Sequence, residues 1–234
     1  MAVGTRNEED IKKDLVDQLY WDSRIDAADV HIDISDGSVI LTGTVPTVVA
    51  KMAAEDDAWI TDGVGIVDNQ LEVRFPPETA LPDDEEITSN VMDTLLWHPS
   101  IDSADITPVV ENGWVTLRGA VPSYWQKIRA ERVCRDLTGV VGIINELAVV
   151  PSEDLADQNI AEAVVSSLER NPYVEAEQLD VEVQNGVVTL SGEVPSMIAR
   201  QAANDSAQRT VGVINVENNL TIADSGKYAK TSSE

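Results

Sequence analysis

The chain has 234 residues, enough for several small domains, and it is strongly acidic, with 42 Asp and Glu against 16 Lys and Arg and a net charge of −26. Because phosphate binding needs clustered basic residues, this balance argues against nucleic acid as a partner and against simple electrostatic docking on an anionic membrane. The single cysteine, Cys134, excludes an intramolecular disulfide.

The first residues carry neither an apolar core nor a small-residue cleavage site, so they do not look like a secretory signal. No apolar run approaches the roughly 18 residues that a membrane-spanning helix needs. We therefore expect a cytoplasmic location for the chain as it stands, and a periplasmic one if a signal peptide was removed from it.

One unit of about 75 residues occurs three times, as in a tandem array of domains. Its landmarks in the first copy are Gly37, Leu41, Gly43, Val45 and Pro46. They return as Gly113, Leu117, Gly119, Val121 and Pro122, and again as Gly186, Leu190, Gly192, Val194 and Pro195. We expect three domains, called repeats one, two and three, over residues 1–75, 84–151 and 156–223, and a disordered tail over residues 224–234.

Each repeat is predicted to open with an acidic turn and an amphipathic helix. In repeat one, Ile11, Leu15, Val16 and Leu19 recur at spacings that we assign to one buried helical face. The equivalent residues are Ile87, Val91, Met92 and Leu95 in repeat two, and Ile160, Val164, Val165 and Leu168 in repeat three. We interpret the acids at the helix start, such as those from Asp83 to Glu86, as caps that suit the helix dipole, with a cation site as the alternative.

A β-hairpin is predicted to follow the helix. Asp-Gly and Asn-Gly pairs favour the tight turn of such a hairpin, because both central residues need a positive φ. The glycines that we assign to structural turns are Gly37, Gly113 and Gly186 at the hairpin tip, and Gly43, Gly119 and Gly192 at the close of the second strand.

The second helix is predicted to begin after an N-cap at Thr47, Ser123 or Ser196. It carries a column of small residues, in which Ala54, Ala130 and Ala203 are followed one turn later by Ala58, Cys134 and Ala207. We expect this column to lie against the sheet, which makes Cys134 a structural thiol. The helix should end with Gly63, Gly139 or Gly212 at the position after its C-cap.

A third strand is predicted after that glycine, and it completes an α-β-β-α-β order. The fold class is therefore α+β, with three tandem units that each have a three-stranded mixed sheet and two helices on one face. An asparagine recurs beside this strand, and we expect it to satisfy backbone groups, with direct ligand binding as the alternative. The three asparagines are Asn69, Asn145 and Asn218.

The helix–hairpin–helix–strand unit, with its Gly-x-Val-x-Leu-x-Gly-x-Val-Pro string and the later Gly-Val and Asn, resembles the BON domain family (bacterial OsmY and nodulation). The resemblance covers all three repeats, from about Glu8 to Ile222. It implies a non-enzymatic binding or adaptor module. Members of the family are associated with osmotic and envelope stress, phospholipid contact, periplasmic chaperoning and, in one cytoplasmic branch, potassium binding.

The sequence contains no recurrent catalytic group. Neither His31 nor His98 has a histidine at the equivalent positions, and no phosphate loop, dinucleotide fingerprint or zinc motif is present. We therefore expect no catalytic residue, no metal and no cofactor.

Aromatic residues supply the candidate contact surface. Trp21 and Trp97 align with Arg170, and their neighbours Tyr20 and Leu96 align with Glu169, so we expect these side chains to be exposed. Contact with a partner and packing between adjacent repeats both remain open for this patch. Trp59 aligns with Arg135 and is also expected to face solvent, whereas Trp125 is expected in the core and Trp114 is left open.

A basic stripe on the second helix of repeat two stands out against the acidic background. We interpret it as a contact for acidic surface of the same chain or another subunit, with an anionic head group as the alternative. Its members are Lys127, Arg129, Arg132 and Arg135.

These patterns favour a stress-associated, non-catalytic protein that binds a protein or lipid partner through exposed helix faces. Two alternatives stay open. The repeats could assemble into a structural homo-oligomer, or the acidic surface could bind a monovalent cation, particularly potassium. Sedimentation and calorimetry with potassium against sodium distinguish these alternatives.

Overall fold

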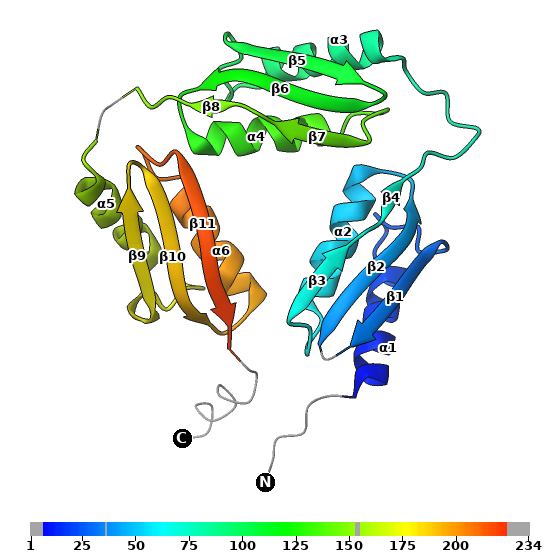
Figure 1. Ribbon diagram of the computed structural model, residues 1–234, viewed down its shortest axis with the longest axis horizontal. Coiled ribbons are helices and arrows are strands. Elements are labelled where there is room, and N and C mark those ends of the chain that lie inside the picture. The colour runs from blue at the N-terminus through cyan, green and yellow to red at the C-terminus, as the bar shows by residue number, and fades with distance from the viewer. Residues whose placement is uncertain (1–6, 36, 153–154, 224–234) are drawn as a thin grey trace. The chain divides into compact units, whose positions relative to one another are not determined.

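The computed structural model describes residues 7–35, 37–152 and 155–223. Within them, each repeat runs in the predicted order of helix, hairpin, helix and third strand, which confirms an α+β fold in three repeated units (Figure 1). Two expectations lie outside the described residues, namely the part played by Asp36 in the first hairpin turn and the disorder of the tail.

Repeat one contains α1 (Glu8–Trp21), β1 (Val30–Ser35), β2 (Ser38–Val45), α2 (Val48–Ile60), β3 (Ile66–Asn69) and β4 (Glu72–Val73). Strand β2 is central. It pairs antiparallel with β1, from Val30 opposite Gly43 to Ser35 opposite Ser38. It pairs parallel with β3 and then with β4, so the predicted third strand is divided into two short pieces.

Repeat two contains α3 (Asp84–Trp97), β5 (Ile106–Glu111), β6 (Trp114–Val121), α4 (Tyr124–Arg135), β7 (Gly142–Asn145) and β8 (Ala148–Val149). Repeat three contains α5 (Asp157–Glu169), the short 3-10 helix η1 (Ala176–Gln178), β9 (Leu179–Gln184), β10 (Val187–Val194), α6 (Met197–Gln208) and β11 (Asn215–Ile222). The second strand of the hairpin, β6 or β10, is again the central strand of its sheet. In repeat three the parallel pairing is continuous, from Val187 opposite Asn215 to Val194 opposite Ile222.

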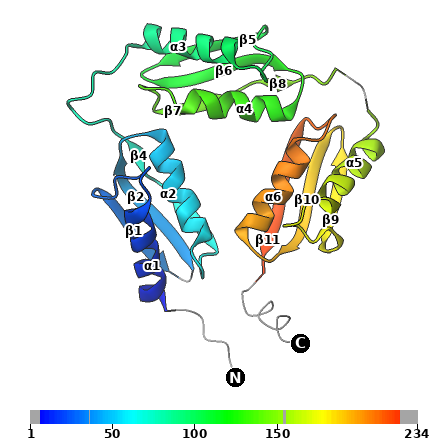
Figure 2. The ribbon, with the colours of Figure 1, turned by 180° about the vertical axis from the view of Figure 1, so that it is seen from behind.

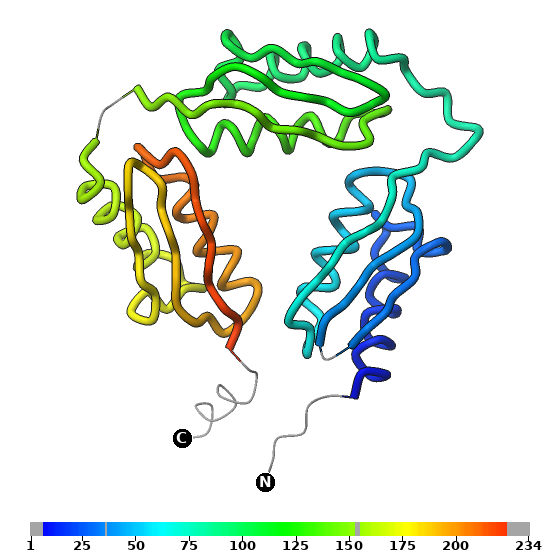
Figure 3. Tube along the Cα trace, in the orientation of Figure 1, coloured from blue at the N-terminus to red at the C-terminus, as the bar shows by residue number. Residues whose placement is uncertain are grey.

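Both helices of a repeat lie on the same side of its sheet, as the front and back views show for each repeat taken by itself (Figures 1 and 2). This arrangement follows from the helical crossover between the second and third strands, which must pack back onto one face. The chain path through one repeat, from first helix to third strand, can be followed in Figure 3.

The core of each repeat lies between its helices and its sheet. In repeat one, Leu15 and Leu19 of α1 meet Leu41 of β2 and Leu71, which follows β3, and all four are at most 1% exposed. The small-residue column is confirmed, since Ala54, Ala58, Ala130, Cys134, Ala203 and Ala207 are all fully buried. Cys134 is a buried thiol in this column.

One predicted core column is wrong. Val16, Met92 and Val165 are 46%, 51% and 38% exposed. Five residues correspond to about 500° of helical rotation, so Val16 lies roughly 140° around the helix from Ile11. The buried stripe follows the spacing of four residues alone, and these three side chains extend the exposed side of the first helix.

The predicted N-caps of the second helices are confirmed. The side-chain oxygens of Thr47, Ser123 and Ser196 accept hydrogen bonds of 3.0, 3.2 and 3.2 Å from the backbone N–H three residues later. The predicted glycine position at the other end is wrong by one or more residues. The C-cap of α2 is Thr61, so Gly63 lies one residue beyond the expected place and serves the turn into β3.

Glycine is required within the second strand of each hairpin, and not at its close as expected, since β2 continues to Val45. Gly43, Gly119 and Gly192 have φ values of 110°, 119° and 126°. A side chain on Gly43 would collide with the carbonyl oxygen of Asp29. The positive φ and the close approach of this backbone exclude other residue types.

Among the described residues, no helix is both long enough and apolar enough to cross a membrane.

Candidate functional site

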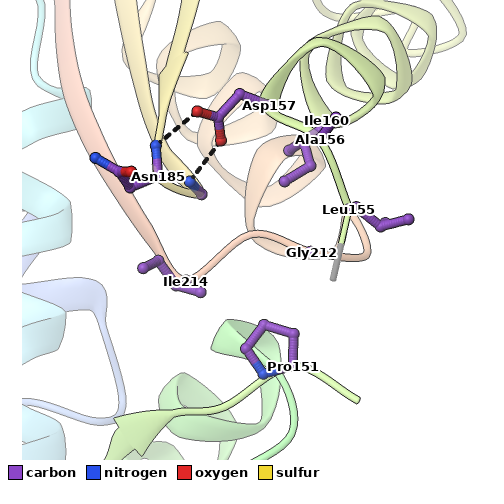
Figure 4. Close-up of a pocket in the computed structure, with 9 residues that line it drawn as sticks. Pro151, Leu155, Ala156, Asp157, Ile160, Asn185, Gly212 and Ile214 are labelled. Carbon is purple, nitrogen blue, oxygen red and sulfur yellow. Dashed lines mark hydrogen bonds between the residues drawn. The ribbon is translucent and has the colours of Figure 1, made fainter. Parts of the chain in front are cut away.

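An aspartate at the start of the first helix holds the hairpin turn in repeats two and three. Both carboxylate oxygens of Asp157 accept backbone hydrogen bonds of 2.8 Å, one from Asn185 and one from Gly186 (Figure 4). Asp84 accepts the equivalent bonds from Asn112 and Gly113 at 2.8 and 2.9 Å. These carboxylates are therefore committed to the fold.

From the sequence alone, we interpret the acids of this turn as helix caps. That role is confirmed for Asp83, whose carboxylate accepts from the Glu86 N–H at 2.9 Å. The long-range role of Asp84 was missed. The sequence does carry a signal for this role. In both repeats two and three, an aspartate stands 28 residues before the asparagine of the Asn-Gly turn.

The recurrent asparagine satisfies backbone groups, as predicted, and in doing so it joins the third strand to the second helix, which was not predicted. The Asn69 side-chain amide donates to the Lys51 carbonyl at 2.8 Å, and its oxygen accepts from the Leu71 N–H at 3.2 Å. Asn145 and Asn218 make the same pair of contacts, to Lys127 and Leu147 and to Arg200 and Leu220. The amide is thus used by the backbone and is not a ligand-binding group.

The first helices of repeats one and two end in exposed apolar side chains. We call Tyr20 and Trp21 in repeat one, with Leu96 and Trp97 in repeat two, the helix-end patches. Trp21 and Trp97 are 80% and 81% exposed, and Tyr20 and Leu96 are 72% and 66% exposed. Large apolar side chains at this exposure contribute nothing to the core of their own repeat, so they are candidates for contact with a partner.

Repeat three ends its first helix differently. Its residues at the two equivalent positions are Glu169 and Arg170, and both are exposed. The fold of the repeat therefore does not require an aromatic residue there. The helix-end patches are additions to the shared design, confined to repeats one and two.

The remaining tryptophans are less exposed than the helix-end patches. Trp59 is partly buried, so its expected exposure to solvent is overestimated, and Trp125 is also partly buried, so its expected core position is wrong. Both errors arose because an equivalent residue in another repeat shows only the side of the helix and not the depth of the side chain. Trp114 is 50% exposed, and its ring lies over the backbone of Gly142 on the neighbouring strand.

Repeat one carries a charged cluster that consists of Asp22, which directly follows its helix-end patch in the chain, Arg24, and Asp57 of α2. The guanidinium of Arg24 donates from Nε to both Asp22 carboxylate oxygens at 3.0 Å, and this hydrogen bonding lowers the pKa of Asp22. Asp57 on α2 is only 5% exposed, and burial raises the pKa of its carboxyl group, with the nearby Asp22 charge acting in the same direction. Its Oδ2 atom is buried without a hydrogen-bond partner among the described residues.

The basic stripe lies on α4. Arg129, Arg132 and Arg135 are spaced by three residues, so they follow one side of the helix, whereas Lys127 is turned towards the flank of the buried Ala130 and Cys134 column. Arg132 is exposed, and the other three side chains are partly buried. The role of this stripe stays a prediction.

Chemistry-bearing side chains do not converge in the part of the chain that the structure describes. It contains no group of three or more His, Cys, Asp or Glu residues arranged to hold a metal ion. His31 is exposed, and His98 accepts a hydrogen bond from the Ser100 N–H at 3.3 Å, which is a local turn contact. The exposed helix ends are therefore the features that a functional account has to explain.

Comparison with known proteins identifies the family of each repeat. The family model described as "BON domain" matches residues 7–74, 83–151 and 156–224. Osmotically-inducible protein Y of Escherichia coli (strain K12) is 31% identical over 144 residues, which cover 59% of this chain and 72% of that protein.

Two solved structures of CdsD, a structural protein of the type III secretion system of Chlamydia trachomatis, also align with the chain. One is 16% identical and covers 93% of this chain and 95% of that chain, with a TM-score of 0.25. The other, the C-terminal domain, is 15% identical and covers 93% and 100%, with a TM-score of 0.26. Similarity at this level carries no argument about the present protein.

Proposed function

The chain belongs to the BON domain family, and on this premise we propose that it is a non-catalytic binding protein of an osmotic-stress response that contacts a protein partner through the helix-end patches. The association with osmotic stress comes from the similarity to osmotically-inducible protein Y. The binding role is inferred from the exposed side chains of the helix-end patches.

One observation carries the proposal. Trp21 and Trp97 occupy equivalent positions in two repeats and are 80% and 81% exposed, whereas repeat three has an arginine there. A tryptophan exposed to this degree is costly in solubility and adds nothing to the stability of its repeat, so contact with another molecule is the economical explanation. Two such patches on one chain would also bind more tightly than one through effective concentration.

The non-catalytic part of the proposal is supported by what the repeats share. The residues that recur three times are turn glycines, core aliphatics, N-caps and the asparagine that joins strand to helix. All of these side chains stabilise the fold. A protein partner is favoured over an anionic lipid surface, because a chain with a net charge of −26 is repelled by such a surface.

The proposal can be tested by giving both patches the residues of repeat three. The full-length variant carries Tyr20→Glu, Trp21→Arg, Leu96→Glu and Trp97→Arg. Far-UV circular dichroism and the melting temperature should stay close to those of the wild type, since the replaced side chains are exposed. The amount of partner recovered with the protein from osmotically stressed cells should fall at least tenfold.

A matched control removes an exposed aromatic residue outside the patches. Tyr173 in repeat three is 65% exposed, and its equivalent in repeat two is Ser100, so Tyr173→Ser removes a comparable surface side chain. This control should recover the same partner as the wild type. Recovery of an undiminished amount of partner with the variant that carries all four substitutions would contradict the proposed function. Turnover of a substrate by the purified chain would also contradict it.

A further inference from the structure

Repeat one has a groove beside its helix-end patch, between the last turns of α1 and α2. It has a volume of about 410 Å³. The indole of Trp21 forms one wall, and Ile60, which is 53% exposed, supplies a second apolar surface. The other lining residues are Asp14, Asp17, Gln18, Thr61 and Asp62.

The groove combines this aromatic wall with negative charge. Three of its lining residues are aspartates, and the first two come from α1 while Asp62 follows α2. Gln18 also hydrogen-bonds the buried Asp57, so a further carboxyl group lies behind the lining. The arginine of the charged cluster, Arg24, is held by both oxygens of Asp22.

The same surface differs in composition in the other repeats. In repeat two, Trp97 and the equivalent of Asp17, Asp93, are retained, but the positions of Asp14 and Asp62 hold Asn90 and Thr138, and the position of Ile60 holds Asp136. In repeat three, no lining acid is retained, and the positions of Trp21 and Ile60 hold Arg170 and Arg209. The full set of three aspartates beside Trp21 and Ile60 thus occurs in repeat one alone among the three repeats, and it is not a requirement of the fold.

We propose that the repeat-one groove binds an arginine side chain from a basic segment of the protein partner. A guanidinium group is planar, stacks on an indole face and offers several donors to surrounding carboxylates, which matches the wall and the charges of this groove. Because a second copy of the chain also carries −26 charges, mutual repulsion disfavours self-association here, and the same charge attracts a basic segment. The inference rests on the proposed function and names the partner chemistry for one of its two patches.

The test uses the full-length chain and a capped peptide with three arginines separated by glycines, titrated calorimetrically at 0.15 M salt. Trp21→Ala should weaken binding about three- to fivefold, the loss expected for one cation–aromatic contact. Tyr173→Ser is the matched control, because it removes an exposed aromatic side chain outside the helix-end patches and leaves the net charge unchanged, and it should bind the peptide like the wild type.

A second matched pair separates the groove from the general acidity of the chain. Asp17→Asn and Asp93→Asn change the net charge equally at equivalent positions. Only Asp17→Asn should weaken binding of the arginine peptide. The corresponding lysine peptide should bind more weakly than the arginine peptide, since an ammonium group lacks the planar stacking surface.

Equal losses for Trp21→Ala and Tyr173→Ser would overturn the groove proposal, because binding of the peptide would then not depend on the groove. Equal binding by all four variants would show attraction by net charge alone and would also overturn it. Neither result bears on the fourfold replacement of the patches, so failure of this inference is distinguishable from failure of the proposed function.

Discussion

Asp57 places a carboxylate at a position where repeats two and three have Val133 and Ser206. In repeat three the Ser206 hydroxyl accepts from the Asn171 amide at 3.0 Å, which satisfies both groups. In repeat one the equivalent of Asn171 is Asp22, so two carboxyl groups replace a neutral hydrogen-bonded pair. Arg24 offsets the charge of Asp22 and leaves that of Asp57 largely uncompensated.

We therefore expect Asp57→Ser to stabilise repeat one. Removing a buried carboxylate with an unsatisfied oxygen should raise the free energy of unfolding of repeat one by about 1 kcal/mol at pH 7. Hydrogen exchange of peptides from α2, measured by mass spectrometry on the full-length chain, reports this change for repeat one alone. Faster exchange in the variant would show that the carboxylate contributes net stability.

The gain should depend on pH with a definite sign. Because burial raises the pKa of Asp57, the folded state binds this proton more tightly than the unfolded state. Wild-type repeat one thus loses stability as the pH rises above about 4, the ordinary carboxyl value, and through the raised pKa. The advantage of Asp57→Ser should be full at pH 7 and shrink as the pH falls towards 4, and a gain that is constant with pH would contradict this cause.

At the residue scale, periodicity predicted the buried stripe of Leu15 and Leu19 but misplaced Val16. Comparison between repeats predicted the exposure of Trp21 and Trp97, because Arg170 at the same position marks a solvent-facing site. The charged cluster around Asp57 could not be predicted in this way, since it depends on packing between two helices that the sequence pattern does not specify.

At the element scale, the asparagine between strand and helix is the contact that the three repeats share most closely. Asn145 donates to the Lys127 carbonyl at 2.9 Å and accepts from the Leu147 N–H at 3.3 Å, so it joins β7 to α4. This places the third strand against the crossover helix at one point along its length. The contact therefore sets the position of the last strand in each sheet.

Asn145→Ala should destabilise repeat two by about 3 kcal/mol, since three partly buried hydrogen bonds, to the Lys127 and Leu147 backbone and to the Glu131 carboxylate, are lost at about 1 kcal/mol each. Urea unfolding followed by hydrogen exchange of α4 and β7 peptides measures this loss. The matched control is Asn90→Ala in the same repeat, where an exposed helical asparagine is replaced and stability should stay the same or rise slightly. Equal effects of the two substitutions would argue against the asparagine contact.

Most elements could be predicted from the sequence because turn glycines, N-caps and alternating strands gave independent signals at each boundary. The division of the third strand could not. Repeats one and three have the same Asn and Leu landmarks there, yet β3 and β4 pair with β2 in two short pieces while β11 pairs with β10 continuously. That difference rests on local hydrogen-bond geometry that residue patterns do not reveal.

At the scale of the whole molecule, the net charge of −26 should make stability depend on salt. Repulsion between like charges opposes the compact state, and the screening length falls from about 30 Å at 0.01 M salt to about 8 Å at 0.15 M. We expect the melting temperature to rise by a few degrees over this range of KCl. Equal rises in KCl and NaCl indicate screening alone, a rise specific to potassium indicates a bound cation, and no rise in either would contradict the electrostatic argument.

The repeat array itself was predictable from the sequence, since three copies of one pattern agree in spacing and residue type. The functional differences that we propose between the repeats become evident only when the exposure of the side chains is known. Repeats one and two carry the helix-end patches, the groove is confined to repeat one, and repeat three has charged residues at the same places. Repeat three is therefore the natural internal reference for every functional substitution in the chain.

Site-specific photo-crosslinking tests the central claim, binding through the helix-end patches, most directly. A photoreactive phenylalanine derivative is placed at position 21, 97 or 170 of the full-length chain, and cells are exposed to osmotic upshift before irradiation. We expect the same crosslinked protein partner from positions 21 and 97 and none from position 170. Crosslinks from position 170 alone, or equally from all three positions, would contradict it.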